Sequence, residues 1–275
     1  GSGGGVGKVT AEWLMNGHIN EDLFIYDIKR FQKFHSEINF ITERITETLG
    51  DLYGMHWPYK QHKTSRNIKT VPYHEDLKKA GACFGVAGGY ERPMWYSKNG
   101  NAEYKYSYNF QNWYPSAEFE TKNTIQNVGL YELTPFCKFE LKGDQIYEEL
   151  QKICTANIKN EIGKCTYTQM LNSDGGIETD LTVVCISEKY FRIIGGAATR
   201  ERDKFHIKKH LKQNIEITDV TDEYVCLGVF GPKSRELMNE ISNEDFSNEN
   251  FRFGCSKNVS IESKDVWVQR LSYVG

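Results

Sequence analysis

The sequence predicts an α+β protein whose sheets are antiparallel. Apolar and charged residues alternate over 137–142, which is typical of a strand with one buried face. Two β-branched runs, 180–186 and 190–194, are separated by Ser187-Glu188-Lys189 and predict a hairpin. The apolar residues of 38–52 recur every three or four positions, which indicates an amphipathic helix. Hairpins that follow helices, rather than alternate strictly with them, favour an α+β fold.

The first helix is expected near the start of the chain. Val6, Val9 and Trp13 recur at helical spacing, and Asn16-Gly17 supplies a stop signal. A Gly-rich phrase precedes Val6, and we expect it to lie ahead of the helix. Uncovered N–H groups at such a helix start attract anionic oxygen atoms. The alternative is a tag or a flexible linker.

The next elements follow in order. Ser36 is a plausible N-cap for the helix over 38–52, and the basic stretch 60–70 predicts a solvated loop. A short helix over 75–80 is ended by Gly81. The remaining predictions are a helix opened by Gly143-Asp144 with Ile146, Leu150 and Ile153 facing inward, a strand over 224–230, a helix opened by Gly231-Pro232 and running through Ile241, and a last strand over 266–274.

One histidine pair has the spacing of metal ligands. His206 and His210 are four residues apart on a predicted helix over 206–212. Lysines surround them, and no acid or thiol follows at a suitable spacing. We therefore expect a solvated helix and no metal site.

Asp180 is the main candidate for chemistry. The turn at Gly175-Gly176 delivers its carboxylate onto the first residues of an apolar strand, where we expect it to be buried. Burial would raise the carboxyl pKa toward the range of a useful acid or base. The alternative is a turn aspartate that caps backbone amides.

The Gly-Gly-x-x-x-Asp-Leu motif around Asp180 resembles that of the glycine-cleavage T-protein (aminomethyltransferase) family. Four further segments resemble the form of that family fused to an FAD-dependent dimethylglycine/sarcosine dehydrogenase. They are Gly3-Gly-Gly-Val-Gly-Lys8 with Ala11-Glu-Trp13, Gly89-Tyr-Glu-Arg-Pro-Met-Trp95, Gly129-Leu-Tyr-Glu-Leu-Thr-Pro-Phe-Cys-Lys-Phe139 and Gln269-Arg-Leu-Ser-Tyr-Val-Gly275. Together the five segments extend from one end of the chain to the other.

The resemblance implies a domain organisation. Residues 1–17 would end an FAD-dependent oxidoreductase domain, and 18–72 would form its central, linking α/β segment. Residues 73–275 would form a T-protein-like, antiparallel-sheet folate-binding domain that is truncated at its C-terminus. We therefore expect an internal fragment of a longer protein, with the dinucleotide-binding domain upstream.

The resemblance also implies two cofactors and their contacts. Tetrahydrofolate would lie against Asp180, which would also be catalytic, and against Tyr273 and Phe136. The alternatives are a cross-strand packing role for Tyr273 and a core role for Phe136. FAD would be held mainly by the absent domain, with its site closed by a set of residues near the start of the chain: Gly3, Gly5, Gly7 and Lys8. The segment Tyr90-Glu91-Arg92-Pro93 is expected to be structural or to lie at a domain junction.

The implied function is oxidative demethylation of an N-methylglycine, with the one-carbon unit passed to tetrahydrofolate. The full protein would be an enzyme, although this fragment alone is expected to be inactive. One alternative is a non-catalytic regulatory subunit of the pyruvate dehydrogenase phosphatase type. Another is a free folate-dependent aminomethyltransferase or demethylase. The small-molecule substrate would be dimethylglycine, sarcosine or a related amine, and the electron acceptor is not identified by the sequence.

The composition is that of a globular protein. Hydrophobic residues make up 39% of the 275 and charged residues 26%, and the net charge of −3 offers no basic footprint for nucleic acid. No apolar run approaches the roughly 18 residues of a membrane span. Seven dispersed cysteines without a Cys-x-x-Cys pair argue against a disulfide framework and for a reducing compartment. We expect the cytoplasm, or the mitochondrial matrix in a eukaryote.

Overall fold

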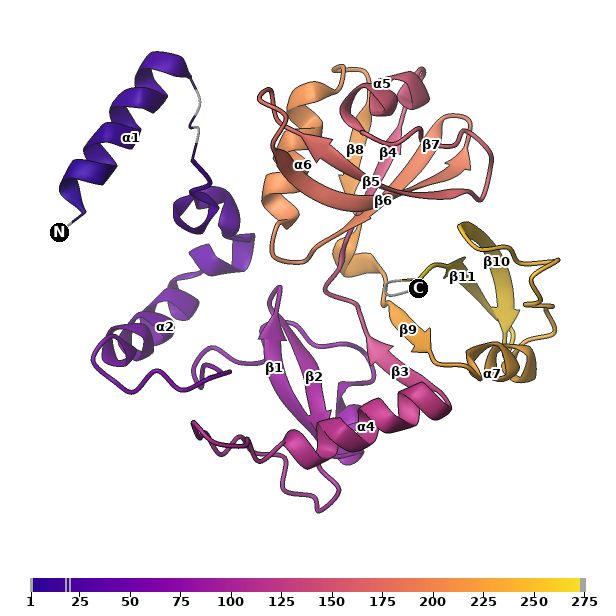
Figure 1. The fold of residues 1–275 in the computed structure, drawn as a ribbon, viewed down its shortest axis with the longest axis horizontal. Helices are drawn as coiled ribbons and strands as arrows, with labels where there is room; N and C mark the ends of the chain where they lie inside the picture. The colour runs from indigo at the N-terminus through magenta and orange to yellow at the C-terminus, as the bar shows by residue number, and fades with distance from the viewer. Residues whose placement is uncertain (1, 18, 20, 273–275) are drawn as a thin grey trace.

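The computed structural model describes residues 2–17, 19 and 21–272, and it has the predicted α+β architecture with antiparallel sheets. The five-stranded unit lies in the upper part of the view, the β1–β2 hairpin and α4 in the lower part, and α1 at the outer margin (Figure 1). The helices are α1 Gly3–Asn16, α2 Ile38–Asp51, α3 His74–Lys79, α4 Tyr114–Gln126, α5 Ile146–Ile153, α6 Arg200–His210 and α7 Ser234–Ile241, with short 3-10 turns η1 Phe24–Tyr26, η2 Ile28–Arg30, η3 Lys33–Ser36 and η4 Thr221–Glu223. The strands are β1 Ala82–Ala87, β2 Tyr90–Tyr96, β3 Gly129–Glu132, β4 Cys137–Lys142, β5 Cys165–Leu171, β6 Ile177–Ser187, β7 Tyr190–Gly195, β8 Glu216–Asp219, β9 Leu227–Phe230, β10 Cys255–Ile261 and β11 Lys264–Arg270.

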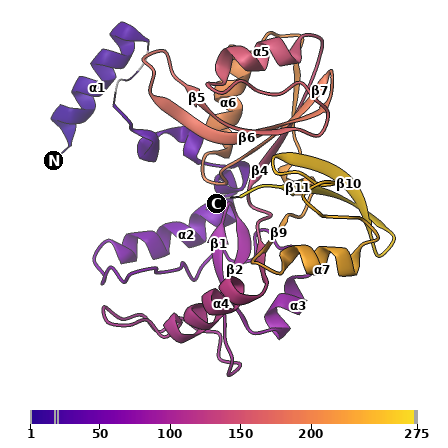
Figure 2. The same ribbon diagram turned by 45° about the vertical axis from the view of Figure 1, so that its right-hand side comes forward.

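A five-stranded antiparallel sheet in the order β5-β6-β7-β4-β8 forms the largest unit. The predicted hairpin is present as β6 and β7, and β6 begins three residues earlier than expected. Phe139 of β4 packs with Leu150 of α5 and Ile207 of α6 in one fully buried cluster. The two helices therefore cover one face of the sheet (Figure 2).

The second face of β4 is also buried, which corrects the predicted alternation of buried and solvated positions. Lys138 is 6% exposed because its ammonium donates to the carbonyls of Thr134 (2.9 Å) and Phe136 (3.0 Å). Glu140 is 9% exposed and accepts from the Arg192 guanidinium at 2.6 Å. Charged side chains can line a buried face when each polar atom has a partner.

Two-stranded sheets complete the fold. The hairpins β1–β2 and β10–β11 are local, whereas β3 pairs with the distant β9. Strand β9 is shorter than predicted because Tyr224, Val225 and Cys226 precede it in irregular structure. The backbone N–H of Leu133 donates to the carbonyl of Cys226 at 2.8 Å, so the chain enters and leaves the five-stranded unit at one point.

Three local predictions at the N-terminal side need correction. The Gly-rich phrase lies inside α1 rather than ahead of it, since the Val6 N–H already bonds the carbonyl of Ser2. The N-cap of α2 is Glu37, because Ser36 belongs to η3 and its hydroxyl donates to the carbonyl of Lys33. The stop at Gly17 is confirmed: this residue adopts φ +76 and caps α1.

The basic stretch 60–70 is a loop, as predicted, but only about half of its residues are exposed and several are bound to neighbouring elements. Glu47 of α2 accepts from the backbone N–H groups of Lys63 (2.7 Å) and Thr64 (2.9 Å). Arg66 pairs with Glu91 of β2, whose side chain is buried. This contact supports the structural role expected for the segment around Tyr90.

Element boundaries differ from the predictions in the C-terminal part. Helix α6 begins at Arg200, and His206 is buried at 8% exposure rather than solvated. Helix α7 begins after Pro232, at Ser234. The last strand in the described residues, β11, ends at Arg270.

Candidate functional site

Asp180 and Phe136 lie at the same end of the five-stranded sheet. Leu181 of β6 and Cys137 of β4 both pair with Gly195 of β7, so these three residues form one row across the sheet. Asp180 comes one residue before Leu181, and Phe136 comes one residue before Cys137. Two strand spacings of about 4.8 Å place their backbones roughly 10 Å apart.

The side chain of Asp180 is exposed, and the expectation that it is buried is wrong. Its neighbours Thr179 and Leu181 are buried on the helix-covered face, and side chains alternate along a strand. Asp180 therefore points to the opposite face. There the hydroxyl of Tyr167 on β5 donates to Asp180 Oδ2 at 3.0 Å.

Asn172, and not Asp180, caps the glycine turn. The Asn172 Oδ1 atom accepts from the backbone N–H groups of Asp174 (3.0 Å) and Gly176 (2.8 Å). Gly175 adopts φ +82, which favours glycine at that position. The turn therefore closes without the Asp180 carboxylate, which stays available at the surface.

Phe136 lies outside the core, with 39% of its surface exposed. Its backbone is fixed on both sides, because its N–H donates to the Leu133 carbonyl and its carbonyl accepts from Lys138. The alternative reading of Phe136 as a core residue does not fit this exposure. Its ring offers an exposed apolar surface at the end of the sheet that carries Asp180.

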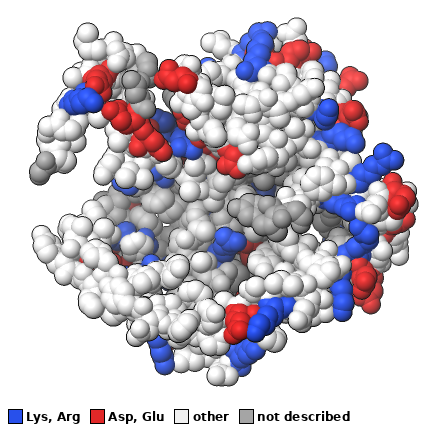
Figure 3. Space-filling view, in the orientation of Figure 1, with Lys and Arg blue, Asp and Glu red and all other residues white. Residues whose placement is uncertain are grey.

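Four segments distant in sequence meet beside this end of the sheet. A Cβ atom added at Gly88, in the β1–β2 turn, would lie 3.5 Å from Ala197 Cβ, 3.6 Å from Gln32 Nε2 and 3.7 Å from Pro135 Cβ. Ala197 follows the end of β7, and Pro135 precedes Phe136. The surface is hollowed between the five-stranded unit and the β1–β2 hairpin (Figure 3). A ligand held by Asp180 and Phe136 would adjoin this junction.

A second carboxyl, which the sequence reasoning missed, lies behind Asp180. Asp203 of α6 is 1% exposed, and its Oδ2 atom accepts from the Thr199 hydroxyl at 2.6 Å. Burial raises the pKa of Asp203 to about 6, and the negative charge of Asp180 contributes to the rise. A glycine pair at the end of a strand, followed by an acid in the first turn of the next helix, is the sequence signal that could have indicated it.

The residues predicted to close the flavin site lie apart from Asp180. Gly3, Gly5 and Gly7 are in α1, at the margin of the molecule, and the segment that contains η1 and η2 lies between α1 and the sheet (Figure 1). Lys8 is exposed and forms ion pairs with Glu12 and Glu21, both at 3.5 Å. Tyr273, the third predicted folate contact, falls outside the described residues. These assignments remain predictions.

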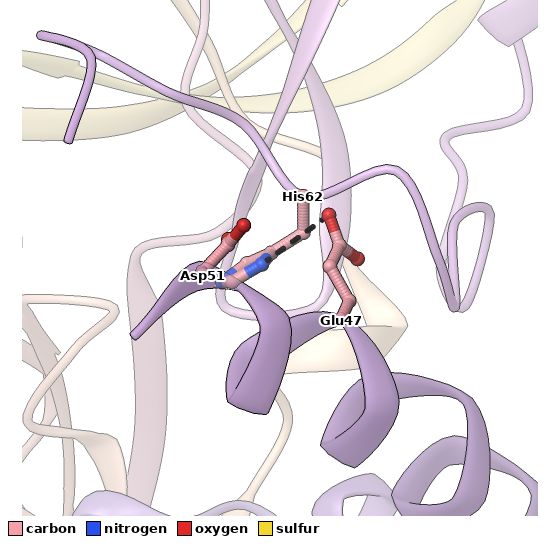
Figure 4. Close-up of side chains that lie close together, drawn as sticks. All are labelled: Glu47, Asp51 and His62. Atoms are coloured by element: carbon pink, nitrogen blue, oxygen red, sulfur yellow. Dashed lines mark ion pairs between the residues drawn. The ribbon is translucent and has the colours of Figure 1, made fainter. Parts of the chain in front are cut away.

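One group in the described residues has the proximity of metal ligands. The ligand atoms of Glu47, Asp51 and His62 lie within 4.8 Å of one another (Figure 4). The Lys60 ammonium already pairs with Asp51, and Thr64 and Lys63 donate to Glu47. The cluster thus acts as an ion-pair network that fastens the 60–66 segment to α2.

Comparison with known proteins gives two matching family models. Residues 73–275 match the GCVT N-terminal domain, and residues 16–70 match the FAD dependent oxidoreductase central domain. None of the helices in the described part of the chain combines the length and apolar character that a membrane crossing needs.

Two curated relatives match almost the whole chain. A 4-methylaminobutanoate oxidase (formaldehyde-forming) of Paenarthrobacter nicotinovorans is 37% identical over 98% of this chain and 33% of its own length. The mitochondrial dimethylglycine dehydrogenase of Rattus norvegicus is 29% identical over 99% of this chain and 32% of its own length. The chain thus spans about a third of the length of these relatives.

A solved structure shares the fold. The glycine cleavage system aminomethyltransferase T of Bartonella henselae superposes with a TM-score of 0.60 at 22% identity. The superposition covers 75% of this chain and 51% of the other.

Proposed function

This chain belongs to the family of the GCVT N-terminal domain, and we propose that it is the central and folate-binding part of an FAD-dependent demethylase of N-methylated amino acids. The match of residues 16–70 to an oxidoreductase central domain supports the flavin link. We propose the division 1–17, 18–72 and 73–275 for the oxidoreductase end, the linking segment and the folate-binding domain. The two relatives, which are named for oxidation of N-methylated amino acids, support the substrate class.

In the full protein, FAD would accept a hydride from the N-methyl carbon, and tetrahydrofolate would accept the one-carbon unit. This chain would supply position and a proton acceptor to the second step. Asp180 carries the proposal: its carboxylate is at the surface, and Tyr167 orients it through Oδ2. A positioned carboxylate can take the proton that a folate amine loses as it attacks carbon. Phe136 would contribute apolar contact.

Release of formaldehyde is the competing outcome, because water can intercept an unshielded one-carbon unit. The bacterial relative is named for forming it. The ratio of 5,10-methylene-tetrahydrofolate to formaldehyde is therefore the most direct measure of how well the folate site captures the one-carbon unit.

Asp180→Asn in the full-length enzyme tests the role of Asp180. Flavin reduction by substrate should stay near wild type, because that step does not involve the folate site. Formation of 5,10-methylene-tetrahydrofolate should fall by about 10²–10⁴-fold, with a matching rise in formaldehyde. Both products are measured side by side, together with the melting temperature.

Asp174→Asn is the matched control, since it makes the same change in the adjoining turn, at another exposed position. It should leave the product ratio unchanged. A wild-type ratio in well-folded Asp180→Asn would remove Asp180 from the mechanism. Absence of flavin reduction by any N-methylated amino acid in the wild-type enzyme would favour the regulatory alternative.

A further inference from the structure

The start of β5 and the start of β10 are joined through the backbone. The N–H of Cys165, the first residue of β5, donates to the carbonyl of Gly254 at 2.8 Å. Next to this bond, Lys164 and Cys255 lie opposite each other across an antiparallel bridge. The bridge connects the five-stranded unit to the β10–β11 hairpin, so these two residues have fixed backbones on separate parts of the fold.

The side chains of the two opposed residues are in contact. Lys164 Nζ lies 3.6 Å from Cys255 Sγ. A second partner of this ammonium is Glu161, whose Oε2 atom is 4.0 Å away on a largely exposed side chain. A surface ion pair of this kind contributes little and does not hold the ammonium in place. Lys164 and Cys255 are both half-buried, and a small molecule can reach them.

Cys255 combines a thiol with an amine that can react. Burial raises the pKa of six cysteines and so disfavours the nucleophilic thiolate at these positions: Cys83, Cys137, Cys154, Cys165, Cys185 and Cys226. The charge of Lys138 acts on Cys226, but Lys138 is 6% exposed and its ammonium donates to backbone carbonyls. Lys164, by contrast, has no such carbonyl contacts among the described hydrogen bonds.

An amine and a thiol in contact can be joined by formaldehyde, the smallest aldehyde. The sulfur of Cys255 adds to the carbonyl carbon, and the thiol proton goes to the oxygen. Lys164, once it has lost its ammonium proton to water, attacks the same carbon. The hydroxyl group then leaves with an amine proton as water, and an N–CH₂–S bridge remains. The carbon keeps its oxidation level, so the reaction needs no oxidant.

We propose that Lys164 and Cys255 form a modification site at which formaldehyde links Nζ to Sγ through one carbon atom. The two atoms must approach closer than 3.6 Å, which the flexible lysine side chain permits. The origin of the aldehyde rests on the proposed function, in which formaldehyde is the competing product. The β10–β11 hairpin precedes Tyr273 in the sequence, so the bridge ties released formaldehyde to the segment next to a predicted folate contact.

Treatment of the full-length enzyme with formaldehyde tests the site directly. Mass spectrometry of the digest should show the peptides of Lys164 and Cys255 joined, and heavier than their sum by one carbon atom. Half-maximal linkage should need at least about 10-fold less formaldehyde than linkage of Lys138 to Cys226, because the contact supplies orientation. Linkage of both pairs at the same concentration, or none at Cys255, would overturn the proposal.

Two substitutions and a matched control assign the atoms. Lys164→Gln and Cys255→Ser should each abolish the joined peptide. Lys257→Gln removes another lysine, on β10 itself, and should leave the link intact. A joined peptide that persists in Lys164→Gln would mean that a different amine supplies the nitrogen.

Turnover of an N-methylated amino acid tests the enzyme's own formaldehyde. The link should accumulate when tetrahydrofolate is absent and should be largely suppressed by excess tetrahydrofolate. A link that carries an oxygen atom in place of the carbon would indicate oxidation by peroxide and would overturn the proposal. If the wild-type enzyme releases no formaldehyde, the proposed function fails, whereas the experiment with added formaldehyde still decides the modification site.

Discussion

At the scale of single residues, two buried charged side chains, Lys138 and Asp203, differ in how they are stabilised. Lys138 donates to the carbonyls of Thr134 and Phe136 and is thereby solvated by the protein. Asp203 accepts from the Thr199 hydroxyl, and burial raises its pKa to about 6. The first arrangement stabilises a turn near Phe136. In the second, burial makes the ionised form of Asp203 less favourable than that of an exposed aspartate.

Glu47 allows a test of how one ionised carboxylate contributes to the free energy of unfolding. Burial opposes its ionisation, but donors from Thr64 and Lys63 outweigh burial and lower its pKa to about 2. A folded-state pKa below the ordinary value of 4.5 means that Glu47 stabilises the fold above pH 4.5. That contribution is lost as the pH falls from 4.5 toward 2.

We therefore expect Glu47→Gln to lower the free energy of unfolding at neutral pH by roughly 1–3 kcal/mol. Its urea-unfolding free energy should also depend less on pH between 4.5 and 2 than that of the wild type. The control is Glu75→Gln on α3, whose carboxylate is largely exposed. Equal pH dependence in wild type and Glu47→Gln would contradict the assignment.

At the scale of elements, the sequence predicts the strands that alternate clearly or carry β-branched runs. It does not predict strands whose own residues show neither pattern and which form only by pairing with a neighbouring strand. β5 buries only Thr168 and Met170, and its extended conformation is stabilised by pairing with β6 along its whole length. α4 has no buried residue and no apolar stripe, so only Pro115 in its first turn signals it.

The candidate site could be predicted in part. The alternation of side chains along β6 could have placed Asp180 on the outer face, since Leu181 points inward. The burial of Asp203 depends on its close approach to Gly195, and the glycine pair 195–196 ahead of α6 is the local signal that could have indicated it.

The β1–β2 turn offers a test of packing between elements. Gly89 adopts φ +85, and a Cβ atom there would lie 2.7 Å from the Phe34 ring. Gly89→Ala should therefore lose about 1 kcal/mol for the backbone and a further 1–3 kcal/mol for overpacking. Gly100→Ala has a similar φ of +75 with nothing within 4 Å, so it isolates the backbone cost. Equal melting temperatures for the two variants would show that Phe34 does not pack on this turn.

At the scale of the whole molecule, the Asp222 carboxylate is one of several contacts between the N-terminal part and the five-stranded unit, together with the hydrogen bond from Gln32 Nε2 to the carbonyl of Ala197. Asp222 accepts from the Lys69 ammonium (2.9 Å), the Tyr90 hydroxyl (2.9 Å) and the Arg200 guanidinium (3.2 Å). Its donors come from the stretch before α3, from β2 and from α6. The site therefore depends on contacts between regions that are far apart in sequence.

Asp222→Asn should loosen that connection without unfolding either part. Hydrogen exchange followed by mass spectrometry should show lower protection in β1–β2 and around Lys69, and unchanged protection in β6–β7. Asp76→Asn, which alters an exposed ion pair on α3, serves as the control. Uniform loss of protection throughout the chain would mean that Asp222 supports overall stability and not the junction.

The pairing of β3 with β9 also has a consequence for biosynthesis. Every strand of the five-stranded sheet lies between residues 133 and 226, so that sheet can close on the ribosome before β9 emerges. β3 is made first and waits for its partner. At about 5–20 residues per second, that interval lasts on the order of ten seconds. During it the open edge of β3 is a template for pairing with another nascent chain. Slow translation after residue 226 would therefore favour misassembly between neighbouring chains on one messenger RNA.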